Sequence, residues 1–134
     1  MPQPKCTVVS IIEDDPSFRR AAERLLRALG FEAHTFASAE EFLRNALPAP
    51  CACLVVDLHL PGMSGIDLIH YLAKLSAPPP TIFITAREDE NLRQRACLIP
   101  NSVYLRKPFT GQSLLEAMRS LLKNCASGEE RSER

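Results

Sequence analysis

Five short apolar runs alternate with five amphipathic segments along this chain, and this alternation constrains the fold more than any other feature. The runs are rich in the β-branched, aliphatic and aromatic residues of buried strands, and the segments between them repeat apolar residues at helical spacing. Strands that alternate with helices predict a parallel sheet with helices on both faces. The short strands, closely followed by helices, favour a flavodoxin-like α/β fold, a (βα)5 three-layer sandwich with strand order 2-1-3-4-5. The expected strands are residues 6–12, 31–36, 53–57, 81–85 and 103–105.

Capping residues indicate where the helices begin. Asp15 followed by Pro16 is the order typical of an N-cap and a first helical position. Ser38 with Glu41 three residues later forms a capping box. The other expected N-caps are Ser64 and Thr110.

Two of the helices are expected to differ in how firmly they are anchored. The helix after Ser64 is predicted to bury Ile66, Ile69, Leu72 and Ala73. The segment 86–98 is mostly charged and offers the core little beyond Leu92 and Ala96. Its helix is therefore expected to be among the first elements to shift.

The composition is that of one globular domain, with 46% hydrophobic and 24% charged residues. Residues 6–123 are expected to form this domain, and residues 124–134 a polar tail or linker. Sixteen basic residues balance sixteen acidic ones, so no overall electrostatic field draws the chain to nucleic acid. No apolar run approaches a membrane span in length. The five cysteines lack a CxxC pair, which favours thiols in a reducing cytoplasm over a metal site at Cys51 and Cys53.

Charged and polar residues stand where the expected strands end. They are Glu13 and Asp14 after the first strand, Asp57 at the end of the third, Thr85 at the end of the fourth and Lys107 after the fifth. In a sheet of this order these ends meet at one rim. Crowded carboxylates repel one another unless a cation joins them, and a hard divalent ion such as Mg²⁺ suits their oxygens. Lys107 and Thr85 are then placed to hold a phosphoryl group while Asp57 attacks its phosphorus.

Each of these residues, taken singly, has an ordinary explanation. Asp57 can cap the turn before Pro61 and Gly62, and the acids at 13–15 can simply begin a helix. Lys107 can be a surface lysine, and Thr85 an ordinary strand threonine. Their joint appearance at one rim is what favours phosphoryl transfer.

Four segments carry a likeness to a known family, and the likeness spans residues 6–123. They are Ile11–Ser17, Val55–Gly65, Ile84–Ala86 and Tyr104–Phe109. With these motifs the chain resembles the response regulator receiver domains, the CheY-like domains of the bacterial two-component family. The resemblance implies a phosphoacceptor switch in a histidine-to-aspartate phosphorelay. It implies no enzyme beyond self-catalysed phosphotransfer and autodephosphorylation.

The same resemblance assigns roles to the acids at the rim. Asp57 is implied to be the phosphoacceptor. Asp14, Asp57 and the backbone carbonyl of His59 are implied to hold Mg²⁺, for which Mn²⁺ can substitute. Glu13 is implied to act on the metal directly or through water.

The resemblance also implies how the phosphoryl group is held and sensed. Thr85 and Lys107 would hold its oxygens. Tyr104 would turn inward when Thr85 moves towards the phosphate. The peptide bond between Lys107 and Pro108, often cis in this family, would aim the lysine side chain.

Three features of the chain depart from the family pattern or belong to its variable positions. Glu13 is a methylene longer than the common aspartate and is expected to re-space the metal site. Pro100 stands where a glycine is frequent, and because proline cannot adopt a positive φ this loop is expected to be built differently. His59, Ala86 and Arg87 flank the site, and His59 and Arg87 are predicted to tune how fast water reaches the phosphoaspartate.

The resemblance further implies partners. A sensor histidine kinase would supply the phosphoryl group from its phosphohistidine. An output domain or downstream protein, and a second copy in a phosphorylation-dependent homodimer, would use the face made by the fourth helix, last strand and last helix. The domain is expected in the cytoplasm, serving transcription regulation without contacting membrane or nucleic acid itself. The chain could be freestanding or the receiver of a DNA-binding regulator.

Three rival functions stay open on the sequence alone. A degenerate receiver, acting as a phosphorylation-independent interaction module, would be consistent with Glu13 and Pro100. An aspartyl-nucleophile phosphohydrolase would carry a second carboxylate two residues after its nucleophile, where this chain has His59. A flavodoxin would need a phosphate-binding loop where this chain has the acids at 13–15, which would repel phosphate.

Overall fold

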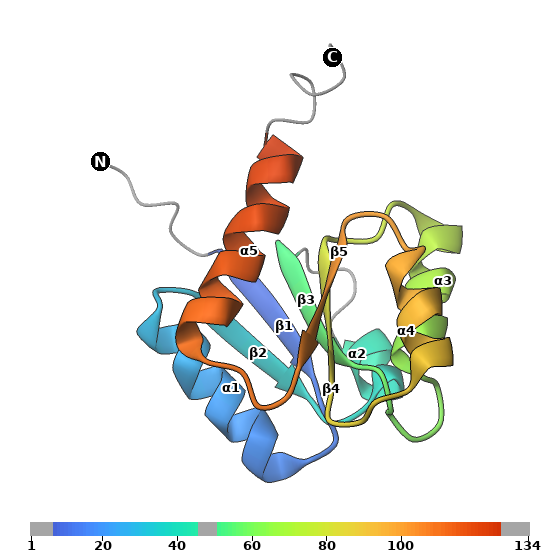
Figure 1. The fold of residues 1–134 in the computed structure, drawn as a ribbon, viewed down its shortest axis with the longest axis horizontal. Helices are drawn as coiled ribbons and strands as arrows, with labels where there is room; N and C mark the ends of the chain where they lie inside the picture. The colour runs from blue at the N-terminus through green and yellow to red at the C-terminus, as the bar shows by residue number, and fades with distance from the viewer. Residues whose placement is uncertain (1–6, 46–50, 127–134) are drawn as a thin grey trace.

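The structure, a computed structural model, describes residues 7–45 and 51–126 and alternates strictly between strand and helix (Figure 1). The strands are β1 (Val8–Ile12), β2 (Glu32–Phe36), β3 (Cys53–Asp57), β4 (Thr81–Thr85) and β5 (Ser102–Arg106). The helices are α1 (Pro16–Ala28), α2 (Ala39–Asn45), α3 (Gly65–Leu75), α4 (Glu90–Cys97) and α5 (Gly111–Ala126). The alternation predicted from the apolar runs is confirmed.

The strands form one parallel sheet in the order β2-β1-β3-β4-β5, which confirms the predicted flavodoxin-like topology. β3 lies at its centre and is paired on both sides. Ile12 of β1 is in register with Val56, and Asp57 is in register with Ile84 of β4. This register sets the carboxyl ends of β1, β3 and β4 side by side at one edge of the sheet.

Two separate hydrophobic clusters hold the helices against the sheet, with α1 and α5 on one face and α2, α3 and α4 on the other (Figure 1). On the first face Leu26 of α1 packs with Leu114 and Met118 of α5 against Ile11 and Ile84. All five side chains are fully buried. Because helices cover both faces, the inner strands are apolar without the alternation of a half-exposed strand.

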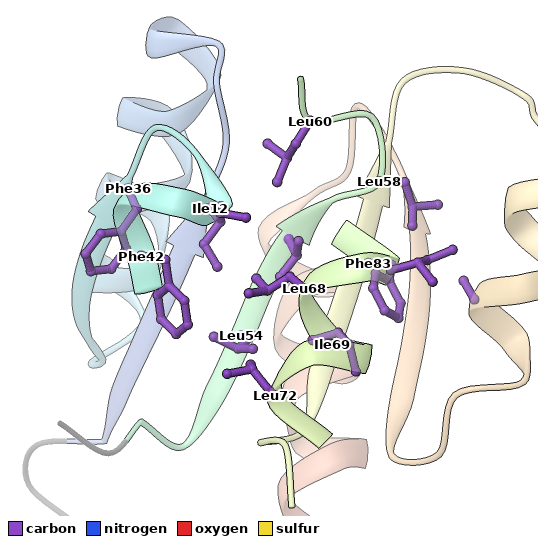
Figure 2. Close-up of a cluster of buried hydrophobic side chains, with 14 residues drawn as sticks. Ile12, Phe36, Phe42, Leu54, Leu58, Leu60, Leu68, Ile69, Leu72 and Phe83 are labelled. Atoms are coloured by element: carbon purple, nitrogen blue, oxygen red, sulfur yellow. The ribbon is translucent and has the colours of Figure 1, made fainter. Parts of the chain in front are cut away.

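Figure 2 shows the cluster under α2, α3 and α4, where Phe42, Ile69 and Phe83 lie among its members. Of the residues of α4, Ala96 alone is fully buried in this cluster, with Leu92 partly buried against it. The weak anchoring expected for this helix is therefore confirmed.

The predicted N-caps are confirmed. The side chains of Asp15 and Ser64 accept backbone N–H groups in the first turns of α1 and α3. Ser38 Oγ accepts from the N–H of Glu41 at 3.0 Å. The return bond of this capping box runs from the N–H of Ala37 to Glu41 Oε1 at 2.8 Å, one residue before the position that the pattern predicts.

One detail differs from the sequence-based expectations, and another agrees with them. Ala73 is exposed, not buried, because it lines an open cavity of about 510 Å³ between the ends of α3 and α4. The loop before β5 accommodates Pro100 by giving the left-handed conformation to the next residue, Asn101, with φ 58°. Asparagine tolerates this conformation better than most residues, so the loop needs no glycine.

The last helix begins at the expected cap. α5 begins after Thr110, whose Oγ1 accepts from the N–H of Ser113 at 3.0 Å. The helix continues to Ala126, past the expected domain boundary at residue 123. Cys6 and residues 127–134, which the predictions included, lie outside the described residues.

The cysteines of the third strand region behave as buried thiols. Cys53 is buried, Cys51 is partly buried, and both are free. Burial raises the pKa of both thiols, that of Cys53 to about 12. Neither belongs to a group of three or more metal-binding side chains within the described ranges. In the same residues no helix has both the length and the apolarity to cross a membrane.

Candidate functional site

Four of the five residues predicted to meet at the rim of the sheet, Glu13, Asp14, Asp57 and Lys107, lie together. Lys107 Nζ lies 2.7 Å from Glu13 Oε1 and 3.1 Å from Asp57 Oδ2, so one ammonium bridges the ends of β1 and β3. The three side chains are 13%, 1% and 8% exposed, respectively. Ion pairs this deeply buried are much less screened by solvent than surface pairs.

Burial sets the protonation of this cluster. It raises the pKa of Glu13 to about 7, although Lys107 and the backbone N–H of Asp15 both favour the carboxylate. Burial alone would lower the pKa of Lys107, but its contacts with Glu13 and Asp57 outweigh this and raise it. The site therefore holds a firmly charged ammonium beside an acid that titrates near neutral pH.

The acids offer a set of oxygen ligands. Glu13, Asp14 and Asp57 have ligand oxygens within 4.8 Å of one another, and they are the one such group among residues 7–45 and 51–126. Glu13 and Asp57 are buried, whereas Asp14 is exposed and leaves one side open to water. Mg²⁺ prefers oxygen donors and keeps part of its water shell, so these residues fit it.

Local structure fixes the Asp57 carboxylate at the end of β3. The backbone N–H of His59 donates to Asp57 Oδ1 at 2.8 Å, while Lys107 contacts the other oxygen. Gly65 allows the first turn of α3 to come close, because a Cβ there would lie 2.8 Å from the backbone oxygen of Asp57. This requirement for glycine was not predicted from the sequence.

Phe18 of α1 is a further neighbour of the ammonium that the sequence did not reveal. Lys107 Nζ lies 4.2 Å from the centroid of the Phe18 ring, a distance typical of a cation–π contact. Phe109 packs edge-on against the same ring, with centroids 5.6 Å apart. The bond between Lys107 and Pro108 is cis, as the resemblance implied.

Thr85 lies at the end of β4 with its hydroxyl engaged inside the chain. Its Oγ1 is 3.2 Å from His59 Nδ1, accepts from the N–H of Arg87 at 3.1 Å and donates to the Arg87 carbonyl oxygen at 3.0 Å. His59 is thus a partly buried residue of the site, whereas the side chains of Ala86 and Arg87 are exposed.

Tyr104 of β5, the predicted switch residue, is partly buried against the cluster of α2, α3 and α4. The guanidinium of Arg93 on α4 lies over its ring, 5.8 Å from the centroid. Tyr104 therefore connects β5 with the weakly anchored helix α4.

A family model for the response regulator receiver domain matches residues 9–119. Nodulation protein W of Bradyrhizobium diazoefficiens is 41% identical over 111 residues, which cover 83% of this chain and 49% of that protein. The response regulator protein TmoT of Ectopseudomonas mendocina is 34% identical over 117 residues, covering 87% of this chain and 53% of that protein. The chain thus spans about half the length of these curated relatives.

Solved structures agree with the sequence relatives. The crystal structure of a response regulator receiver protein from Burkholderia phymatum has a TM-score of 0.75 and 36% identity, covering 87% of this chain and 94% of that chain. The matched region includes every strand end that contributes to the site.

Proposed function

The chain belongs to the response regulator receiver domain family, and on this premise we propose that it is a switch that accepts a phosphoryl group on Asp57. The observation that carries the proposal is the contact of Lys107 Nζ with Asp57 Oδ2 at 3.1 Å, beside the carboxylates of Glu13 and Asp14. The arrangement combines an oriented nucleophile, a fixed positive charge and a set of metal ligands at one buried site.

In the proposed reaction, an oxygen of Asp57 attacks the phosphorus of a phosphohistidine on a sensor histidine kinase. An O–P bond forms, the N–P bond breaks, and its electron pair stays on the donor nitrogen, which leaves a neutral imidazole. Lys107 offsets the charge on the phosphoryl oxygens, and the Thr85 hydroxyl donates a hydrogen bond to one of them. In autodephosphorylation, a water oxygen would attack the same phosphorus and form a new O–P bond. The bond from phosphorus to Asp57 would break, its electron pair would return to the carboxylate, and inorganic phosphate would leave with the protons of the water.

Glu13, Asp14 and Asp57, with the backbone carbonyl of His59, are the proposed Mg²⁺ ligands, and Mn²⁺ can replace it. Bound there, the ion would supply positive charge that offsets the phosphoryl oxygens. The support for including Glu13, despite its longer side chain, is that its oxygen lies within 4.8 Å of those of Asp14 and Asp57.

Phosphorylation would act on the face made by α4, β5 and α5. When Thr85 turns to the phosphoryl group, Tyr104 would follow and repack against α4, which has little buried surface to resist the change. The proposed binding partners of this face are an output domain or downstream protein and a second copy of the chain. Gel filtration with and without beryllofluoride, a phosphoryl mimic, would show the dimer as earlier elution, and identical elution at high concentration would contradict it.

We place this switch in the cytoplasm and in the control of transcription, with DNA contacts made by other domains. The support is the relatives, among them the response regulator protein TmoT, of which this chain matches about half. His59 and Arg87 are proposed to tune the lifetime of the phosphoaspartate. An unchanged dephosphorylation half-life after both are replaced by alanine would contradict that role.

The function can be tested with a small acyl phosphate as donor. Wild type should take up one phosphoryl group per chain with Mg²⁺ and none with a chelator, and Asp57→Asn should take up none. A folded wild type that stays unlabelled would instead indicate a phosphorylation-independent interaction module. Continuous phosphate release without labelled protein would indicate a phosphohydrolase.

A further inference from the structure

We propose that Asp89 and His59 are positioning residues that hold the Thr85 hydroxyl in its resting conformation and release it on phosphorylation. This inference rests on the proposed function, in which Thr85 donates to the phosphoryl group. The three side chains lie in line. Asp89 Oδ2 is 3.7 Å from His59 Nε2, and His59 Nδ1 is 3.2 Å from Thr85 Oγ1.

The imidazole of His59 is confined between its two neighbours. Its side chain is 20% exposed, and its Nε2 atom is buried without a hydrogen bond at standard distance. A buried ring nitrogen is costly to leave unpaired. The Asp89 carboxylate lies just beyond that distance, at 3.7 Å, and so presents a negative charge to this nitrogen.

Asp89 also decides which way the hydrogen bond to Thr85 runs. A carboxylate next to Nε2 favours the proton on Nε2, because a lone pair there would face the negative charge. His59 Nδ1 is then an acceptor, and it shares the Thr85 proton with the Arg87 carbonyl oxygen, 3.0 Å from Oγ1. A hydroxyl has one proton, so a Thr85 that donates to these two acceptors has none left for a phosphoryl oxygen. Asp89 and His59 thus compete with the phosphoryl group for the Thr85 proton.

The same line of residues reaches helix α4. Asp89 is the N-cap of α4, and its second oxygen, Oδ1, accepts from the N–H of Leu92 at 3.1 Å. Release of Thr85 therefore removes a restraint on the residue that caps α4. This gives the phosphorylation site a connection to α4 that does not pass through Tyr104.

The ordinary explanation of Asp89 is that it only caps the helix, and one substitution separates the two roles. Asp89→Ser keeps a capping oxygen, because serine is a good N-cap, but it removes the carboxylate that faces His59. His59→Ala removes one of the two acceptors of the Thr85 proton. Asp67→Ser, at an exposed acid in the first turn of α3, is the matched control.

The first measurement is the affinity for beryllofluoride in saturating Mg²⁺, followed by NMR. Asp89→Ser and His59→Ala should each tighten binding by about two- to tenfold, the range expected for loss of one competing hydrogen bond. The double variant should bind no tighter than either single variant, because both remove the same restraint. Asp67→Ser should match wild type. Unchanged affinity in Asp89→Ser, or additive effects in the double variant, would overturn the proposal.

A second measurement needs no phosphoryl mimic. In wild type the ¹⁵N shifts of the His59 ring should show a protonated Nε2, and Thr85 should populate one χ1 rotamer. Asp89→Ser should lower the Nε2-protonated fraction and broaden the Thr85 rotamer distribution. A protonated Nδ1 in wild type, or a Thr85 rotamer that neither variant alters, would refute the restraint. If wild type does not bind beryllofluoride but shows the expected His59 tautomer and Thr85 rotamer, the proposed function is refuted and the restraint on Thr85 is not.

Discussion

Mg²⁺ affinity should depend on the protonation of Glu13. Burial raises the pKa of this side chain from 4.5 to about 7 in the metal-free chain, so at neutral pH about half of the molecules carry a proton that a metal ion must displace. For one displaced proton with this pKa, the Mg²⁺ dissociation constant should be about tenfold larger at pH 6 than at pH 8. Glu13→Gln has no such proton, so its weaker binding should be nearly independent of pH in this range.

Calorimetric titration of Mg²⁺ in buffers of different ionisation enthalpy measures both the affinity and the protons released. Wild type should release about half a proton per ion at pH 7, and Glu13→Gln much less. Glu116→Gln, at an exposed glutamate of α5, is the control and should behave as wild type. Equal pH dependence in wild type and Glu13→Gln would refute the reasoning.

The same shift predicts how stability varies with pH. Because the folded pKa of Glu13 lies above the unfolded value, the unfolded chain loses this proton first as pH rises. The contribution of Glu13 to the unfolding free energy should thus be full below about pH 4.5 and decline up to about pH 7, by roughly 3 kcal/mol. Urea denaturation of metal-free wild type against Glu13→Gln across this range measures the difference.

Two further substitutions test the surroundings of the site. Phe18→Leu should slow phosphorylation by an acyl phosphate by about two- to fivefold, because Lys107 loses a cation–π contact worth about 1 kcal/mol. Phe109→Leu should have a smaller effect. Equal phosphorylation rates in wild type and Phe18→Leu would contradict this prediction. Gly65→Ala should lower the unfolding free energy by about 1–3 kcal/mol, since its Cβ would meet the backbone of Asp57, and a thermal denaturation midpoint at or above wild type would disprove it.

The parts of the fold that the sequence predicted closely are those fixed by local chemistry. The bounds of β3 and β4 came out as expected, because a buried strand needs an unbroken apolar run and ends where polar residues begin. The N-caps at Asp15 and Ser64 were predicted because a capping oxygen reaches a backbone N–H only two or three residues away. β5 proved longer than its apolar run, because Ser102 and Arg106 join the sheet through the backbone alone.

The sequence predicted which residues form the site, but not the contacts that they make with one another. Topology alone brings Asp57 and Lys107 to one rim, so their meeting needed only the strand order. The line from Asp89 to Thr85 depends on the rotamer of His59, and the Phe18 contact depends on how α1 sits on the sheet. Such contacts join residues far apart in the sequence and leave no pattern in it.

The most direct test of the central claim is to find which side chain carries the phosphoryl group. Wild type labelled by an acyl phosphate in Mg²⁺ would be treated with hydroxylamine, which converts an acyl phosphate to a stable hydroxamate, and mapped by tandem mass spectrometry. The modification should lie on Asp57 alone and be lost with a chelator. Modification of Glu13 or Asp14 instead, in a chain that folds normally, would contradict the account.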